Sequence, residues 1–139
     1  MPVNTLTVTD AHAAQLDGAT YIDVRSSAEF AAGRPAGAIN VPLQDDDEDT
    51  GQLMANPDFV RVMRANFPAD ARLLVGCQSG GRSGRAAQIL EAFGFTNVTN
   101  VPAGFAGWEP AGLPIDAATP PKRAYKDLLA VADANDECT

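Results

Sequence analysis

Short apolar runs alternate with helical patterns along this chain, and no other feature limits the fold as much. Turn-forming Gly, Pro, Asn and Asp residues separate the segments, so each apolar run is followed by a stretch of helical spacing. This alternation predicts βα units around a largely parallel sheet. The predicted strands are 6–8, 19–24, 38–41, 72–75 and 97–101. The predicted helices are 10–16, 26–33, 57–67, 83–93 and 122–134, with a turn that enters a short helix at 103–108.

Size and charge narrow the functional class. The chain has 139 residues, which suits one domain, and carries 18 acidic against 10 basic side chains, a net charge of −8. That charge argues against nucleic acid or an anionic membrane as a partner. No apolar run is long enough to span a bilayer, and the first residues do not resemble a signal peptide, so we expect a cytoplasmic protein. Because the chain has only two cysteines and one histidine, we expect no disulfide framework, no metal site and no cofactor.

One segment combines an apolar strand, a cysteine, a glycine-bearing loop and a helix. Cys77 stands just before the helix, where the positive end of the helix dipole favours the nucleophilic thiolate. Gly80 and Gly81 allow the backbone amides to turn inward around an anion, and Arg82 adds a permanent positive charge. These features predict a lowered pKa for Cys77 and an anion held at its sulfur. The alternative is a buried structural cysteine beside a plain tight turn.

Three groups of motifs occur in order along the chain. They are YIDVR at 21–25 with EF at 29–30 and GAINVP at 37–42, then CQSGGRS at 77–83, then GFAGW at 104–108 with GLP at 112–114. Taken together they resemble the rhodanese-like sulfurtransferases, most closely the single-domain members. The resemblance covers about residues 6 to 116.

The resemblance implies a rhodanese-like α/β fold, with a five-stranded largely parallel sheet and helices on both faces. It implies a domain at 1–120, with 121–139 as a helical extension and tail. It also implies sulfur transfer, in which Cys77 takes the outer sulfur of thiosulfate or a similar donor as a persulfide and passes it to cyanide or a thiol. A thiol on a protein is a further acceptor of this class. The implied substrate-binding residues are Gln78, Ser79, Gly80, Gly81, Arg82 and Ser83.

Two positions depart from the family pattern. Gly33-Arg34 stands where members usually have Gly-His; we expect a surface change, the alternative being a cation that attracts an anionic donor. Gln78 occupies a loop position that is basic in some thiosulfate users, and Arg82 can supply the charge instead.

Several other residues have structural interpretations that we prefer to functional ones. Asp23 and Arg25 are expected to form an ion pair or a cap that holds the loop. Arg85 is expected to face solvent or to pair with Glu91 or Asp70, and His12 to be a solvated or hydrogen-bonded side chain. Trp108 is expected in the core or a pocket wall, with its indole N–H bonded.

Two polar segments are expected to be solvated. Cys138 lies in a polar tail and is expected to be a free thiol, although a disulfide with Cys77 is the alternative. The acidic run 45–49 is expected to form a solvated loop, with a docking patch for a basic partner as the alternative.

Two other functions stay open. Cysteine-dependent phosphatases and arsenate reductases on the same fold place the arginine six positions after the cysteine, whereas Arg82 stands at the fifth. A shorter loop suits a sulfur atom better than a tetrahedral oxyanion. The remaining alternative is a non-enzymatic rhodanese-like binding module, and the intact loop at 77–83 argues against it.

Overall fold

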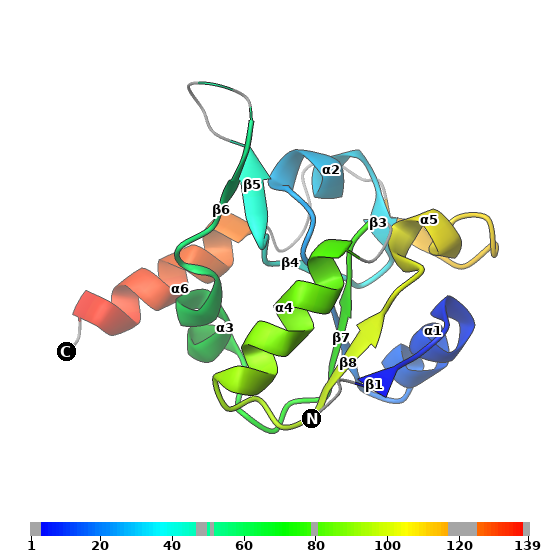
Figure 1. The fold of residues 1–139 in the computed structure, drawn as a ribbon, viewed down its shortest axis with the longest axis horizontal. Helices are drawn as coiled ribbons and strands as arrows, with labels where there is room; N and C mark the ends of the chain where they lie inside the picture. Colours follow the sequence, from blue (N-terminus) through cyan, green and yellow to red (C-terminus); the bar gives the residue numbers. More distant parts are fainter. Residues whose placement is uncertain (1–3, 47–49, 51, 79–80, 117–124, 138–139) are drawn as a thin grey trace.

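A five-stranded parallel sheet forms the centre of the molecule (Figure 1). The structure is a computed structural model that describes residues 4–46, 50, 52–78, 81–116 and 125–137. Every strand pair in the sheet is parallel, which confirms the predicted largely parallel α/β fold. In spatial order the strands are β1 (Asn4–Thr5), β8 (Val98–Val101), β7 (Leu73–Gly76), β2 (Thr20–Asp23) and β4 (Ile39–Asn40).

Helices cover both faces of this sheet. Side chains alternate along each strand, so Ile22 of β2 joins one buried cluster and its neighbour Tyr21 joins the other. The Ile22 cluster lies under α3 (Phe59–Asn66), α4 (Gly81–Ala92) and α6 (Tyr125–Glu137). The Tyr21 cluster lies under α1 (Val8–Leu16) and α5 (Gly104–Trp108).

Helix caps fix where α1 and α2 begin. The predicted capping box is confirmed: the Ser26 hydroxyl accepts from the Glu29 amide, and the Glu29 carboxylate accepts from the Ser26 amide, as α2 (Ser27–Ala32) begins. The predicted strand at 6–8 is wrong, because α1 starts at Val8. The cap of α1 is Thr7, whose hydroxyl accepts from the Asp10 amide at 3.1 Å.

Two small antiparallel pairs were not predicted. β3 (Arg34–Pro35) pairs with β9 (Ile115–Asp116), and β5 (Gln44–Asp46) pairs with β6 (Leu53–Ala55) in a hairpin that projects beside α2 (Figure 1). Residues 45–46 therefore lie in a strand, and the expected solvated loop is wrong for them; residues 47–49 are outside the described part of the chain. Asp45 accepts hydrogen bonds from the amide and the hydroxyl of Ser27, which ties the hairpin to the start of α2.

The expectation of a surface change at Arg34 is also wrong. This side chain is only 3% exposed, donates to the Phe30 carbonyl and stacks over the Phe30 ring. It lies 3.4 Å from the Asp116 carboxylate. Arg34 therefore links β3 to β9.

The C-terminal helix packs into the main core. Leu128 of α6 is fully buried, the Asn66 amide of α3 donates to the Leu128 carbonyl, and Arg61 pairs with Asp133 at 3.0 Å. The division of the chain at residue 120 stays a prediction. Within the described ranges, no helix has the length and apolar character needed to cross a membrane.

Candidate functional site

Cys77 follows directly on the middle strand of the sheet. Cys77 is 2% exposed. Its thiol donates a hydrogen bond to the Ser83 hydroxyl in the first turn of α4, with 3.6 Å between Sγ and Oγ. Parallel strands end at the same edge of a sheet, where α/β proteins bind their ligands. The cysteine therefore lies between the carboxyl end of β7 and the amino end of α4.

The helix after the loop starts earlier than predicted. α4 begins at Gly81 rather than Ser83, so Arg82 and Ser83 belong to its first turn. Gly81 has no left-handed backbone conformation. Its amide is one of the first-turn donors of α4 that have no helical acceptor, and the predicted inward turn of the loop amides is not tested at this glycine. Ser79 and Gly80 lie outside the described residues, so the amide cradle around the sulfur stays a prediction.

Arg82 is bound to Glu29 of α2. Its Nη1 and Nη2 donate to the two carboxylate oxygens at 2.6 and 3.0 Å. These hydrogen bonds lower the pKa of Glu29 to about 2 and raise the pKa of Arg82. The loop arginine thus has a fixed counter-ion, which was not predicted.

A second arginine lies beneath the loop. Arg25 and Asp23 form the predicted ion pair, 2.7 Å apart and almost fully buried. Burial raises the pKa of Asp23, and its hydrogen bonds with Arg25 oppose that rise. Arg25 also donates to the Gly33 carbonyl at 2.6 Å and to the Gln78 side chain at 3.4 Å. The pair therefore braces the segment that begins at Cys77.

The amino end of α5 holds the backbone of the cysteine. The Phe105 amide donates to the Cys77 carbonyl at 2.8 Å, and the Ala106 amide donates to the Gln78 carbonyl at 3.0 Å. Gly104 has φ +55°, and a Cβ there would overlap the Cys77 carbonyl oxygen. Only a glycine permits this close approach of the two backbones.

The Tyr21 hydroxyl packs against Gly76 at the end of β7. A Cβ at Gly76 would overlap the Tyr21 hydroxyl, so the strand needs a glycine where the tyrosine reaches it. Burial raises the pKa of Tyr21 well above its ordinary value. The phenol is therefore a neutral group at physiological pH.

A cavity of about 230 Å³ opens beside the loop. Its walls include Arg25, Glu29, Gly33, Gln78, Phe105 and Glu109. The cavity brings the loop residue Gln78 together with Glu29 of α2 and with Arg25, which lies between β2 and α2.

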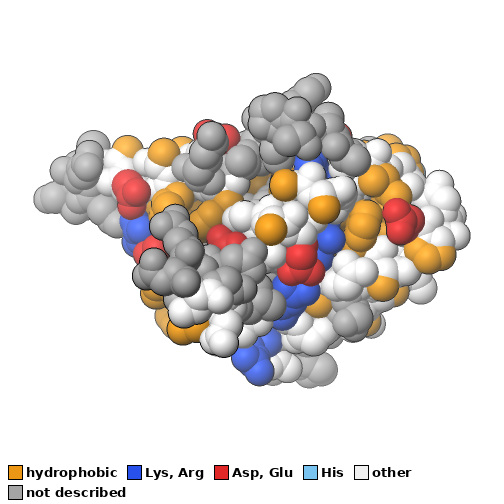
Figure 2. Space-filling view, turned by 90° about the horizontal axis from the view of Figure 1, so that it is seen from above, with side chains coloured by type: hydrophobic (Ala, Val, Ile, Leu, Met, Phe, Trp, Pro, Cys, Tyr) orange, Lys and Arg blue, Asp and Glu red, His pale blue; other side chains and the backbone are white. Residues whose placement is uncertain are grey.

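The face that carries the amino end of α4 holds charges of both signs. Figure 2 shows Lys and Arg side chains in a short row there, with acidic side chains against them. Arg82 is paired with Glu29, whereas Arg85 is exposed and has no hydrogen-bond or ion-pair partner among the described residues. The prediction that Arg85 faces solvent is confirmed.

The remaining predictions have mixed outcomes. Trp108 is confirmed as a core residue, fully buried with its indole N–H bonded to the Pro114 carbonyl at 2.7 Å. His12 meets the Trp108 ring edge-on, with 5.6 Å between centroids. Cys138 lies outside the described residues.

Sequence reasoning missed the site roles of Glu29, Gly104 and Tyr21. The capping box already explained why a glutamate stands at position 29, so the local sequence pattern did not predict its ion pair with Arg82. Gly104 and Tyr21 lie in the motifs at 104–108 and 21–25, but their contacts join segments that are distant in sequence. Only the folded arrangement shows what these residues touch.

Comparison with known families gives a match over most of the chain. The model of the rhodanese-like domain matches residues 7–111. The chain is 40% identical over 114 residues to thiosulfate sulfurtransferase 16, chloroplastic, of Arabidopsis thaliana, covering 82% of this chain and 93% of that protein. It is 35% identical over 96 residues to the mitochondrial protein HIGH ARSENIC CONTENT 1 of the same plant, covering 69% of this chain and 56% of that one.

Similarity extends to solved structures. The crystal structure of Rv0390 from M. tuberculosis aligns with a TM-score of 0.70 at 26% identity, covering 85% of this chain and all of that one. The chain spans about half the length of several other curated relatives that it matches.

Proposed function

The chain belongs to the rhodanese-like domain family, and from this premise we propose that it transfers a sulfane sulfur from thiosulfate, or a similar donor, through a persulfide of Cys77. The acceptor is cyanide or a thiol. The similarity to a thiosulfate sulfurtransferase over nearly the whole length of that protein supports this activity. Small-molecule donors and acceptors follow from the same chemistry, and a protein thiol is a further acceptor in the proposal.

The position of Cys77 is the observation that carries the proposal. A thiol between the end of the middle strand and the first turn of α4 has the helix amides and dipole beside it, which favour a thiolate. The thiolate attacks the outer sulfur of thiosulfate, the S–S bond breaks, and sulfite leaves with the bonding electron pair. An acceptor nucleophile then attacks the outer sulfur of the persulfide and returns Cys77 to the thiolate.

The residues from Gln78 to Ser83 bind the donor in this proposal. Arg82 keeps further N–H donors beyond the two that Glu29 accepts, so its guanidinium can contact an anion while remaining paired. The first-turn amides of α4 supply the other donors for the negative charge on the persulfide and on the departing sulfite.

Mass analysis of the intact protein after incubation with thiosulfate tests the proposal. We expect the mass to increase by one sulfur atom, and peptide mapping to place that atom on Cys77. Addition of cyanide should return the original mass and release thiocyanate. A protein that gains no sulfur, or gains it on Cys138, contradicts the proposed function.

Arsenate reduction or phosphate ester hydrolysis is the second candidate. It is favoured by the similarity to a protein named for its arsenic content. Against it stands the position of Arg82, which lies one residue closer to Cys77 than the arginine of those enzymes. Assays of one preparation with thiosulfate, arsenate plus a thiol reductant, and an aryl phosphate separate the two candidates.

A cytoplasmic location belongs to the proposal. Sulfur transfer of this kind needs a reduced Cys77, and a reducing compartment preserves it. Microscopy of the tagged full-length protein would test the location; one similar plant protein is named as chloroplastic.

A further inference from the structure

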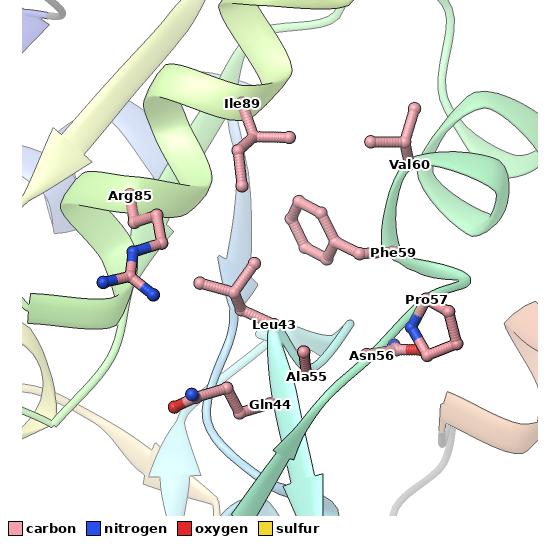
Figure 3. A pocket seen from close by; sticks show the side chains of 9 residues that line it. All are labelled: Leu43, Gln44, Ala55, Asn56, Pro57, Phe59, Val60, Arg85 and Ile89. Carbon is pink, nitrogen blue, oxygen red and sulfur yellow. The ribbon is translucent and has the colours of Figure 1, made fainter.

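A second cavity lies between α3 and α4, and none of the described residues that line it lines the cavity beside Gln78. It has a volume of about 230 Å³ and is bounded by the start of β5, the end of β6 and the two helices. Figure 3 shows its walls, which are mostly apolar. The apolar residues are Leu43, Ala55, Pro57, Phe59, Val60 and Ile89.

Two polar side chains at this cavity are available to a ligand. Among the residues that the structure describes, neither the Arg85 guanidinium nor the Gln44 amide has a hydrogen-bond partner, and both lie on the same side of the cavity in Figure 3. Asn56 is different, because its amide donates to the Pro42 carbonyl and the Tyr125 hydroxyl while its carbonyl oxygen accepts from the Asp58 amide. Asn56 therefore stabilises the wall of the cavity. Arg85 and Gln44 are the polar side chains that can bind a ligand there.

We propose that this cavity binds a small organic anion: a carboxylate or sulfonate on an apolar body of about one ring. Apolar walls favour a hydrocarbon body, and a cavity of about 150 Å³ already accommodates benzene. In the part of the chain that the structure describes Arg85 has no counter-ion, and in a protein of net charge −8 this cation favours an anionic head group. Gln44 supplies a further donor on the same side.

The cavity is close to the catalytic segment but does not belong to it. Arg85 lies one helical turn beyond Arg82 on the same face of α4, and the wall residues Leu43 and Phe59 share the buried cluster that contains Cys77. The inference goes beyond the proposed function, because binding here requires no sulfur transfer. Its test therefore measures binding and not turnover.

Fluorine NMR with 4-fluorobenzoate as the probe tests the inference on the full chain. We expect saturable binding of the benzoate, weaker binding of the neutral 4-fluorobenzyl alcohol, and no competition by acetate, which lacks the apolar body. In methyl spectra the benzoate should shift the signals of Leu43, Val60 and Ile89. No saturable binding, equal affinity for the alcohol, or shifts confined to other residues would overturn the inference.

Variants locate the binding site. Arg85→Gln should weaken benzoate binding by about three- to tenfold, because a partly exposed charge pair is lost. Arg72→Gln makes the same charge change at a remote exposed arginine and should leave the affinity unchanged. Ala55→Phe places a ring from the exposed residue 55 into the cavity and should abolish binding without unfolding the protein. Unaltered affinity in both Arg85→Gln and Ala55→Phe would overturn the inference.

Discussion

The Glu29 carboxylate accepts two hydrogen bonds from the Arg82 guanidinium while it also caps the helix on which it lies. The contacts with Nη1 and Nη2 are 2.6 and 3.0 Å long, and the contact with the Ser26 amide is 3.2 Å. One side chain therefore connects the start of α2 with the first turn of α4, which follows the loop that begins at Cys77.

This carboxylate makes the stability of the protein depend on pH in the acid range. The pKa of Glu29 is about 2 in the folded protein, below its ordinary value of 4.5. The stabilisation is therefore complete above pH 4.5 and is lost as the pH falls toward 2. We expect Glu29→Gln to remove about 1 kcal/mol of stability at pH 7, since the pair is partly exposed. Urea unfolding at several pH values measures this, and a variant that matches the parent at pH 7 contradicts it.

Arg82→Ala should impair donor use more than folding. A charge-assisted contact in a partly enclosed site contributes about 2–4 kcal/mol to transition-state stabilisation, so kcat/KM for thiosulfate should fall tens- to several-hundred-fold. The melting temperature should fall slightly, because Glu29 loses its partner. Arg72→Gln is the control: Arg72 is an exposed arginine before the amino end of β7, the opposite end from Cys77, and its loss should not change kcat/KM. A fall of less than about twofold in Arg82→Ala would remove this residue from the site.

Cys77→Ser should abolish sulfur transfer and leave the fold intact. The hydroxyl is nearly isosteric with the thiol, but it is a much poorer nucleophile at neutral pH. Cys138→Ser is the matched control and should keep the parent rate. Thiocyanate formation and circular dichroism measure the two effects, and an active Cys77→Ser protein would contradict the assignment.

Gly104→Ala should damage both stability and activity. The new Cβ would overlap the Cys77 carbonyl oxygen and would also have to adopt φ +55°. Gly112→Ala is the matched control, because Gly112 has φ +75° and open space around its Cα, so it carries the conformational cost of about 1 kcal/mol alone. We expect sulfur transfer to fall sharply only in Gly104→Ala. Equal effects of the two changes would show that the contact with Cys77 does not matter.

Leu128→Ala tests how far α6 belongs to the folded domain. The side chain is fully buried against the main core, so its truncation should cost about 2–4 kcal/mol of unfolding free energy. Val131→Ala, at a residue 41% exposed on the same helix, should cost much less. If Leu128→Ala unfolds at the parent's urea concentration, α6 is an appendage and the division at residue 120 gains support.

The sequence predicted the features that depend on local pattern. The strands later found as β2, β4, β7 and β8 are short apolar runs between turn residues, and the capping box at Ser26 is a local motif. The ion pair of Asp23 and Arg25 joins residues two positions apart. Periodicity and spacing carry enough information for each of these.

Features that depend on distant partners were missed or wrong. Arg34 was expected to be a surface change where related proteins have a histidine, yet Asp116 and the Phe30 carbonyl compensate its burial. The hairpin of β5 and β6 escaped prediction because its first strand is acidic and has low strand propensity. The pairing of Arg82 with Glu29 required knowing how α2 and α4 pack.

The antiparallel pair of β3 and β9 has a consequence for the order of folding. It joins residues 34–35, inside the rhodanese-like region at 7–111, to residues 115–116 just beyond its end, with the Ala36 amide bonded to the Pro114 carbonyl at 3.0 Å. Closing so long a loop costs chain entropy that only the assembled sheet can offset, so these contacts form late in folding. Hydrogen exchange during refolding should protect the amides of β7 and β2 first and the amide of Ala36 last. Cys77 therefore directly follows a strand that is already ordered before β3 and β9 pair.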